Sequence, residues 1–296
     1  MARVKANNID IEYDTFGDPS QKPLLLIMGL GAQMTRWREG FCTRLVDQGH
    51  YVIRFDNRDV GLSHKFDHAG VPNMGQVIFN LQNDQPIDAP YNLNDMADDA
   101  AGLLDALGIE RAHVCGASMG GMIAQTMAVR HGHRLHTLTS IMSSTGNPDL
   151  PPAEPDAYAA LLTPTGKTLE ENMERWLSIS KVIGSPAYPE AEESIRFHAK
   201  SDYERSFYPL GAARQFAAVA ASGNRKPALA KVKVPTLVIH GDKDPLVPLA
   251  GGLDTHEAIP GATLKIFEGM GHDLPEPLWE AMIESISSHT ARHQAS

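Results

Sequence analysis

A serine that can act as a nucleophile lies in the segment Gly116-Ala-Ser118-Met-Gly120, which matches the pattern G-x-S-x-G. An apolar run ending at Cys115 precedes it, and a helical pattern begins directly after the serine, at Met119. On such a strand-to-helix turn the hydroxyl projects from the sheet edge, and small residues two before and two after it let the strand and the helix approach closely. The turn also aims the helix N-terminus at the hydroxyl, where it stabilises a developing oxyanion. The pattern predicts Ser118 as a nucleophile.

A base and an acidic partner must support this serine, because a serine hydroxyl is a weak nucleophile at neutral pH. His272 lies in a glycine-rich loop directly after the last predicted strand, and Asp244 lies in the loop after the preceding strand. These loops converge with the Ser118 turn at one edge of the sheet. We predict that His272 is the general base, that Asp244 orients it, and that an ester is hydrolysed through an acyl-enzyme.

Two other acidic residues, Asp242 and Asp273, lie within two residues of the predicted acid and base and are alternatives for the acid. Asp244 is favoured because it precedes Pro245-Leu-Val-Pro248, a turn that can project its carboxylate toward the histidine. His240 is expected to be a hydrogen-bonded histidine at a strand end rather than a ligand.

An oxyanion hole in this geometry takes one backbone N–H from the residue after the nucleophile, here Met119, and one from the loop after an early strand. That loop comprises residues 28–32, so Leu30 is the second candidate donor. The loop is glycine-rich but lacks both the Walker lysine pattern and G-x-G-x-x-G, which argues against a phosphate site. His131 and His133 have no carboxylate or cysteine set around them that would complete a metal site. The predicted chemistry needs no cofactor and no metal.

The elements that must position these residues follow from short apolar runs that alternate with helical patterns. Such runs are typical of strands covered on both faces, and they predict a mostly parallel sheet. Ahead of them, residues 4–5 and 9–13 predict an antiparallel pair that turns at Asn7 and Asn8. The apolar runs are residues 24–28, 52–55, 113–115, 138–142, 236–240 and 264–267.

Two helices on the sheet are also predicted. Apolar residues at helical spacing over residues 93–107 follow Asn92, which can cap the helix start, and precede Gly108, which suits the position just past its end. The second helix begins at Met119 and runs to about His131.

The alternation stops at about residue 144, where proline-rich turns lead into helical patterns up to about residue 225. A capping box at residues 168–171 opens a helix toward Ile183, and residues 209–221 predict another helix. The long connection over residues 64–90 holds a short apolar helix at residues 76–81 and is expected to join the same lid. We predict a catalytic domain of residues 1–143 and 226–296, with residues 144–225 as a helical cap.

Composition limits the class of protein. A chain of 296 residues with 42% hydrophobic content can bury one large core, and a net charge of −10 argues against nucleic acid and anionic membranes as partners. Residues 1–8 lack the apolar run of a signal peptide, and no stretch approaches the roughly 20 apolar residues that span a bilayer. Cys42 and Cys115 are expected to be buried free thiols. We expect a cytoplasmic monomer or homodimer whose partner is a small-molecule ester.

With these pieces placed, the chain resembles the α/β-hydrolase superfamily over nearly its whole length, and within it the bacterial carboxylesterases related to aclacinomycin methylesterase. The resemblance implies an α/β-hydrolase fold with a mostly parallel eight-stranded sheet flanked by helices and an inserted helical cap. It also implies Ser118, Asp244 and His272 as the catalytic triad, and Leu30 and Met119 as oxyanion donors. The matching segments are Phe16-Gly-Asp-Pro19, Leu26-Ile-Met-Gly29, Arg54-Phe-Asp-Asn-Arg-Asp-Val-Gly61-Leu-Ser63, Gly116-Ala-Ser-Met-Gly-Gly121, Val234-Pro-Thr-Leu-Val-Ile239 and Gly269-Met-Gly-His272.

The chain departs from many superfamily members at one position, since it has Met28 where they carry a histidine before the glycine. The donor is a backbone N–H at the residue after that glycine, so the oxyanion hole is expected to survive. Apolar side chains in the cap and the long loop are expected to shape an acyl pocket: Ile78, Phe79, Trp176 and Phe216.

Three other functions use the same residues. C–C bond hydrolysis and cofactor-free peroxidation are carried out by relatives with the same triad, and a ligand receptor can be built on a hydrolase scaffold. An aspartate nucleophile is disfavoured by Ser118.

Overall fold

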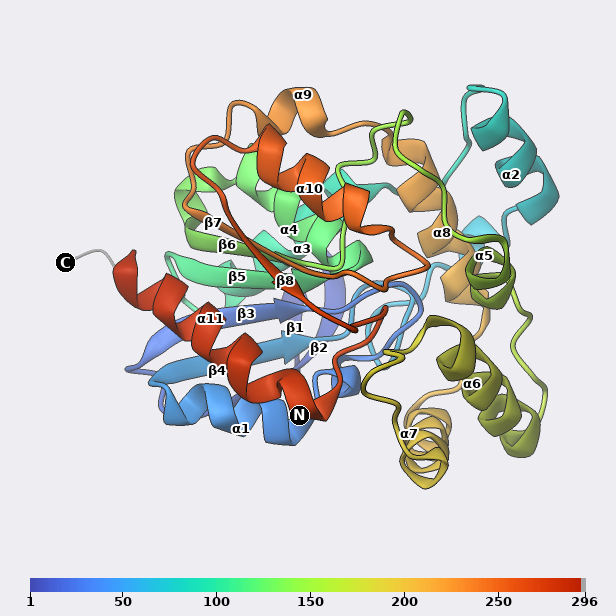
Figure 1. The fold of residues 1–296 in the computed structure, drawn as a ribbon, viewed down its shortest axis with the longest axis horizontal. Helices are drawn as coiled ribbons and strands as arrows, with labels where there is room; N and C mark the ends of the chain where they lie inside the picture. The colour runs from blue at the N-terminus through green and yellow to red at the C-terminus, as the bar shows by residue number, and fades with distance from the viewer. Residues whose placement is uncertain (294–296) are drawn as a thin grey trace.

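An eight-stranded sheet forms the centre of the protein (Figure 1). The computed structural model describes residues 1–293. The strand order is β1-β2-β4-β3-β5-β6-β7-β8; β2 runs antiparallel to both of its neighbours, and every other neighbouring pair is parallel. The strands are β1 (Ala2–Ala6), β2 (Ile9–Phe16), β3 (Lys22–Ile27), β4 (His50–Phe55), β5 (Ala112–Ala117), β6 (Leu135–Ile141), β7 (Thr236–Gly241) and β8 (Thr263–Phe267). The mostly parallel sheet predicted from the apolar runs is confirmed.

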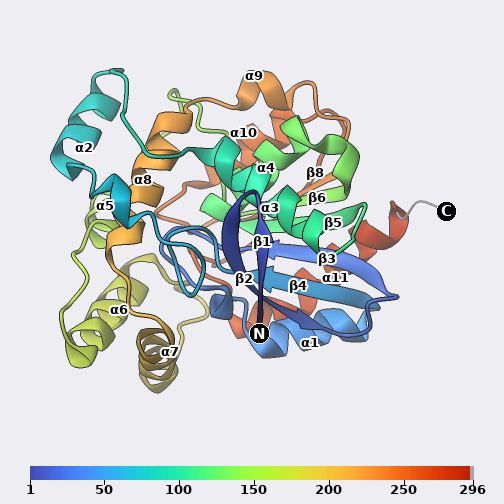
Figure 2. The ribbon, with the colours of Figure 1, turned by 180° about the vertical axis from the view of Figure 1, so that it is seen from behind.

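The predicted antiparallel pair at the N-terminus is β1 and β2. Asn7 and Asn8 form its turn with φ angles of 46° and 65°, a conformation that asparagine tolerates better than most residues. Seen from behind, the hairpin lies across the edge of the sheet beside α3 (Figure 2). The contact is close, because a Cβ on Gly102 would lie 2.8 Å from the backbone nitrogen of Asn7.

Helices cover both faces of the sheet, and alternate side chains of each central strand point to opposite faces. In β3, Leu24 and Leu26 pack on the face covered by α1 (Glu39–Asp47) and α11 (Trp279–Arg292). Leu25 and Ile27 pack on the other face, with α3 (Leu93–Ala106) and α4 (Met119–Arg130). Burial on both faces explains why these strands are continuous apolar runs.

The two helices predicted on the sheet agree with the structure to within a residue or two. Asn92 and Asp95 form a capping box at the start of α3, and Gly108, with φ of +68°, lies just past its end. The remaining short elements are α9 (Lys226–Leu229), α10 (Leu249–Ala258), η1 (Met34–Arg36), η2 (Asp67–Ala69), η3 (Gly132–Arg134) and η4 (Glu276–Leu278).

Of the five helices between β6 and β7 in the sequence, we call the first four together the insertion: α5 (Pro155–Leu161), α6 (Leu169–Ile183), α7 (Glu192–Arg205) and α8 (Leu210–Ser222). They group on one side of the molecule with α2 (Met74–Gln82), which packs against α8 (Figures 1 and 2). The capping box predicted at the start of α6 is present between Thr168 and Glu171. The sequence does not single out α7, because its polar side chains leave only Ile195 and Ala199 buried.

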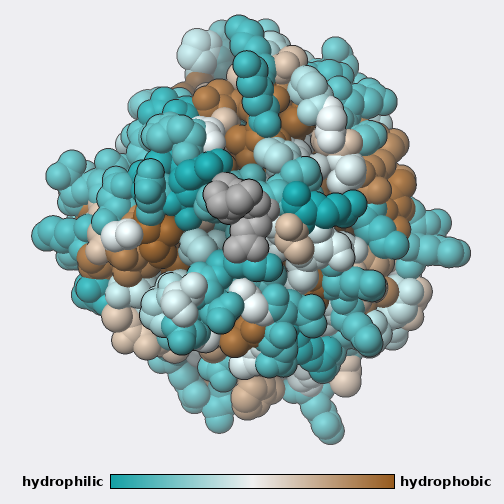
Figure 3. Space-filling view, turned by 90° about the vertical axis from the view of Figure 1, so that its left-hand side faces the viewer, coloured by the Kyte–Doolittle hydropathy of each residue, from teal (hydrophilic) through white to brown (hydrophobic). Residues whose placement is uncertain are grey.

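The end of the molecule opposite the insertion carries mainly hydrophilic side chains, with hydrophobic ones in separate patches (Figure 3). Within the described part of the chain, no helix is long and apolar enough to cross a membrane. Cys42 and Cys115 are buried and unpaired, as predicted.

Candidate active site

Ser118 lies on a strained turn between β5 and α4. Its φ and ψ are 56° and −121°, a region that side-chain-bearing residues rarely adopt and that is often found at functional sites. The neighbouring glycines are required for space: a Cβ on Gly116 would lie 2.0 Å from the carbonyl oxygen of Gly120, and a Cβ on Gly120 would lie 2.1 Å from that of Ile27. The turn therefore presents the serine hydroxyl at the carboxyl edge of the sheet.

The structure brings the three predicted side chains into one hydrogen-bonded chain. His272 Nε2 lies 3.0 Å from Ser118 Oγ, and His272 Nδ1 lies 2.7 Å from Asp244 Oδ2. The other oxygen of Asp244 accepts the backbone N–H groups of Leu246 and Val247 at 2.9 and 2.8 Å. The turn after Asp244 thus fixes its fully buried carboxylate toward the histidine.

The two alternative acids hold loops in place. Asp242 accepts the backbone N–H of Gly269 at 2.6 Å, at the start of the histidine loop. Asp273 accepts both the hydroxyl and the backbone N–H of Ser185, at the end of the insertion's α6, and burial raises the pKa of its carboxyl. Neither is hydrogen-bonded to His272, so the geometry selects Asp244 as the partner of the histidine.

His240, at the end of β7, is hydrogen-bonded through one ring nitrogen, while its buried Nδ1 has no partner among the described residues. Its Nε2 lies 2.8 Å from the carbonyl oxygen of Val247 and 3.6 Å from Asp244 Oδ2. Burial lowers the pKa of the imidazole, so the neutral ring donates to the carbonyl and adds no charge beside Asp244.

Sheet topology explains why these residues meet. The loop after β3 and the Ser118 turn after β5 are side by side, because β3 and β5 are neighbours in the sheet. The chain leaves β3 toward β4 on one side and returns to β5 on the other, so the strand order reverses there. Ligand sites of open α/β sheets lie at such reversal points, outside the carboxyl ends of the strands.

The loop after β3 lies directly against the nucleophile. A Cβ on Gly29 would lie 3.2 Å from Ser118 Cβ, so the glycine lets the backbone pass beside the serine. Among the described residues, the Leu30 N–H has no hydrogen-bond acceptor. The Met119 N–H opens α4 and therefore has no acceptor within its own helix. Neither predicted oxyanion donor is therefore hydrogen-bonded within the described residues.

A cavity of about 1260 Å³ lies above this edge, between the strand-end loops and the insertion. Its lining includes Ser118, His272, Leu30 and Trp176. The Arg36 guanidinium lies over the Trp176 ring, 4.1 Å from the ring centroid.

The other three predicted pocket residues do not line this cavity. Ile78 and Phe79 lie on α2, which packs against α8 rather than over the strand ends, and Phe79 is 57% exposed. Phe216 lies half-buried on α8. The sequence pattern marks these side chains as apolar, but the direction each one faces is set by how the helices pack.

A set of polar residues that was not predicted from the sequence lies beneath the loop after β3. Asn57, which is buried, bonds to this loop, and so does Gln215 of α8 from the insertion. Asp56, also buried, follows β4 directly and accepts the N–H of Met34, at the start of η1. A charged run immediately after a buried strand, at residues 56–59, is the signal that could have drawn attention to Asp56 and Asn57. Among residues 1–293, no group of three or more histidine, cysteine or acidic side chains is arranged to hold a metal ion.

The sheet order, the strained serine turn and the insertion before β7 together define the α/β-hydrolase fold. Comparison with protein-family models agrees: the alpha/beta hydrolase fold family matches residues 22–276, and the chain belongs to this family. A rhodomycin D methylesterase of Streptomyces peucetius is 30% identical, and the similarity covers 97% of each chain. A 2-hydroxymuconate semialdehyde hydrolase of a Pseudomonas species is 32% identical over 84% of this chain and 80% of its own.

Solved structures show the same fold. An enol-lactonase from Burkholderia xenovorans superposes with a TM-score of 0.75 at 22% identity, covering 98% of this chain and all of that one.

Proposed function

We propose that the protein is a carboxylic ester hydrolase that acts through a covalent acyl-enzyme. The observation that carries the proposal is the chain of two hydrogen bonds, of 3.0 and 2.7 Å, that links Ser118 to His272 and His272 to Asp244. In this proposal Ser118 is the nucleophile, His272 the general acid and base, and Asp244 the group that orients the imidazole.

The first half of the reaction forms the acyl-enzyme. The Ser118 hydroxyl donates its hydrogen to His272 Nε2 as its oxygen attacks the ester carbonyl. The carbonyl oxygen becomes negatively charged and accepts the backbone N–H groups of Leu30 and Met119. The imidazolium then protonates the leaving alcohol, and the C–O bond of the ester breaks.

The second half regenerates the serine. His272 takes a proton from a water molecule, the hydroxide attacks the acyl carbonyl, and the imidazolium returns the proton to the Ser118 oxygen as the acid leaves. Asp244 accepts the Nδ1–H throughout, which keeps Nε2 unprotonated in the resting state and stabilises the imidazolium in both halves.

The full-length similarity to rhodomycin D methylesterases supports an ester as the substrate. The cavity of about 1260 Å³ has room for esters of small to medium size, since ligand pockets usually measure about 300–1,000 Å³. The similarity to 2-hydroxymuconate semialdehyde hydrolases supports a second candidate, hydrolysis of a C–C bond beside a carbonyl. Both reactions would use the same serine, histidine and oxyanion donors.

We also propose that residues 144–225 act as the cap of a catalytic domain made of residues 1–143 and 226–296. The insertion contributes one wall of the cavity, and α2, from the loop of residues 64–90, supports it through α8. The backbone N–H of His272 donates to the carbonyl oxygen of Ile183 at 2.7 Å, so the insertion touches the histidine loop directly.

The test is hydrolysis of p-nitrophenyl butyrate, with fluorophosphonate labelling, by the wild type and by Ser118→Ala. We expect the wild type to turn over and label, and the variant to lose about 10⁶-fold in kcat and all labelling, with an unchanged circular dichroism spectrum. A meta-cleavage dienoate assayed in parallel separates C–C from ester hydrolysis. A wild type that neither labels nor turns over either substrate would contradict a serine hydrolase.

A further inference from the structure

The loop that carries the proposed oxyanion donor Leu30 is tied down on both sides of it. On the N-terminal side, Asn57 Nδ2 donates to the carbonyl oxygen of Met28 at 2.8 Å. On the C-terminal side, the backbone N–H of Gly31 donates to Gln215 Oε1 at 2.7 Å. The two peptide groups that flank the Gly29–Leu30 peptide are therefore each fixed by a side chain, while the Leu30 N–H between them is left free.

Gln215 is placed to fix its end of the loop rigidly. The side chain is completely buried, and its Nε2 donates to the carbonyl oxygen of Arg58 at 2.7 Å while its Oε1 accepts from Gly31. Both ends of the amide are thus engaged, so the acceptor oxygen has one orientation. Ala212, one turn earlier in α8, also packs here: its Cβ lies 3.3 Å from where a Cβ on Gly31 would be.

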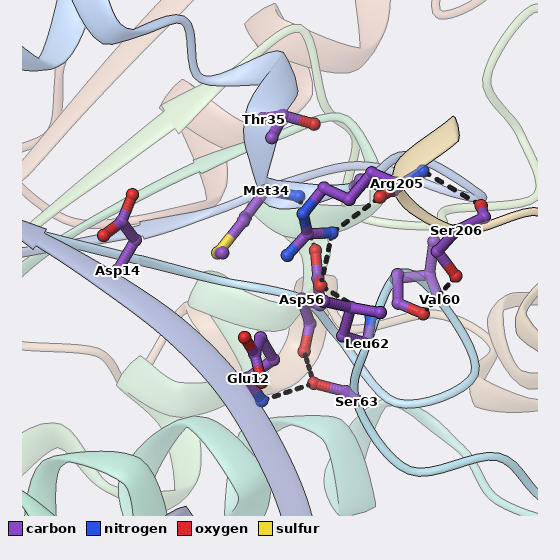
Figure 4. Close-up of polar contacts among 12 residues, drawn as sticks. Glu12, Asp14, Met34, Thr35, Asp56, Val60, Leu62, Ser63, Arg205 and Ser206 are labelled. Atoms are coloured by element: carbon purple, nitrogen blue, oxygen red, sulfur yellow. Dashed lines mark hydrogen bonds and ion pairs between the residues drawn. The ribbon is translucent and has the colours of Figure 1, made fainter. Parts of the chain in front are cut away.

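A second set of contacts joins the same loop to the end of α7 (Figure 4). Gln33 Nε2 donates to the carbonyl oxygens of Asp202 and Ser206 at 2.6 and 3.1 Å. The Arg205 guanidinium donates to Gln33 Oε1 at 2.6 Å and to Asp56 Oδ2 at 2.8 Å. Asp56 Oδ1 in turn accepts the backbone N–H of Met34. The insertion therefore supports the loop at two points, on α8 and at the end of α7.

We propose that Gln215 is a positioning residue for the oxyanion hole: by holding the Gly31 amide it sets the direction of the neighbouring Leu30 N–H, and so couples the seating of the insertion to catalysis. This inference rests on the proposed function, since it assigns Gln215 a role only if Leu30 binds an oxyanion. An N–H that is turned away before the reaction binds the transition state less well than one already aligned, while the ground-state carbonyl is bound almost equally by both.

The test compares Gln215→Met, which keeps the side-chain length but removes both the acceptor for Gly31 and the donor to the Arg58 carbonyl, with Gln215→Glu, whose buried carboxyl keeps both when it is protonated. With p-nitrophenyl butyrate we expect Gln215→Met to lower kcat by about 10- to 100-fold, part of the loss caused by deleting an oxyanion donor, and to change KM by less than about 3-fold. We expect Gln215→Glu to recover much of the lost kcat. A boronic acid, whose oxygen occupies the oxyanion position, should bind Gln215→Met more weakly by a similar factor.

Ser222→Ala is the matched control, because Ser222 on the same helix accepts the backbone N–H of Leu93 at 2.9 Å and does not touch the loop. The concentration of active sites is measured by the endpoint of fluorophosphonate labelling. A low kcat caused by partial unfolding is therefore distinguished from a slower reaction. Amide hydrogen exchange over residues 28–34 supplies a second measurement, and Gln215→Met should exchange faster there than Ser222→Ala.

The outcomes separate this inference from the proposed function. If the wild type turns over and labels, but Gln215→Met matches Ser222→Ala in kcat, boronate affinity and exchange, Gln215 is a structural residue only and the inference is wrong. If Gln215→Glu is as slow as Gln215→Met, the acceptor is not the feature that matters, and the inference is also wrong. If the wild type itself does not turn over or label, the proposed function fails and the inference fails with it.

Discussion

The carboxyl and amino ends of the parallel strands both bury ionisable side chains, with different partners at each end. At the carboxyl end, Asp56 and Asp59 have fully buried side chains, and each pairs with an arginine of the insertion, Arg205 and Arg214, at 2.8 Å. The guanidinium groups and backbone N–H groups replace the water that these carboxylates lose on burial.

At the amino end, the buried ionisable groups are histidines with neutral partners. His50, His113 and His289 are at most 3% exposed. His113 Nδ1 lies 2.9 Å from the hydroxyl oxygen of Thr137, and His289 Nε2 lies 3.2 Å from the carbonyl oxygen of Pro235. Burial lowers the pKa of all three, to about 3 for His113 and about 4 for His289.

Burial alone does not decide whether an ionisable side chain carries a charge. Burial beside an arginine leaves ion pairs at the carboxyl end, whereas burial among neutral partners leaves neutral imidazole rings at the amino end. His240, at the carboxyl end of β7, is the exception, because burial lowers its pKa as well. The ion pairs at the carboxyl end hold the insertion over the proposed active site. The histidines at the amino end make the stability of the fold sensitive to acid, at a place distant from the proposed active site. Three experiments test this difference, each at a different place.

The largest effect is expected at the carboxyl end, for Asp244→Asn. The amide keeps the shape of the carboxylate but favours the wrong tautomer of His272, so kcat should fall by about 10⁴-fold. The matched control is Asp242→Asn, two residues away, whose carboxylate bonds to Gly269 rather than to the histidine. The measurement is the steady-state kcat of both variants. Equal losses of kcat would show that Asp244 does not orient His272.

The second-largest effect is expected on stability. It shows whether the aspartate–arginine pairs at the carboxyl end hold the insertion in place. Arg214→Met leaves the buried Asp59 carboxylate without its charged partner, which should lower the free energy of unfolding by about 3 to 5 kcal/mol. Arg196→Met removes a guanidinium that contacts three acidic residues at the surface, where water replaces it, so its urea midpoint should stay unchanged. Equal midpoints for the two variants would mean that the buried pair does not stabilise the fold.

The smallest effect is expected at the amino end and depends on pH. A histidine whose pKa is lower in the folded than in the unfolded protein gives its full stability above about pH 6.5, and that stability is lost as the pH falls toward the folded value. Between pH 7.5 and pH 5, His113 and His289 should each lower the free energy of unfolding by about 2 kcal/mol.

His289→Gln can still donate to the Pro235 carbonyl but does not titrate. Urea unfolding at several pH values should therefore give a shallower pH dependence for this variant than for the wild type. If the free energy of unfolding depends on pH equally in the variant and the wild type, acid destabilises the fold through other groups, such as the paired carboxylates.

The predictable parts of the structure are those whose signals are local. The Ser118 turn is specified by glycines within two residues of it, and α3 and α6 are each marked by a capping box that closes over four residues. The strand runs could be found because both faces of the sheet are covered. Asp244 could be favoured over Asp242 because the two prolines after it predicted the turn that fixes its carboxylate.

The unpredicted parts depend on contacts between distant segments. Gln215 and Gly31 are 184 residues apart, and an isolated glutamine on a helix carries no pattern that reveals such a contact. Phe79 and Trp176 are both apolar residues on helices, yet one is exposed and the other lines the cavity, because the packing of α2 and α6 decides which way each faces. The weak apolar pattern of α7 hid the helix that delivers Arg205 to Asp56.

Two of the contacts between the insertion and the proposed catalytic loops involve loop backbone next to the reacting groups: the Ile183 carbonyl accepts the His272 N–H, and Gln215 accepts the Gly31 N–H. The insertion also forms one wall of the cavity, so exchanging it for a relative's segment is a direct way to change which substrate fits. In this protein a transplanted segment would also replace both of these contacts. A replacement segment for this protein must preserve the end of α6 and the buried glutamine of α8. Otherwise the change in substrate specificity would also misalign the proposed catalytic residues.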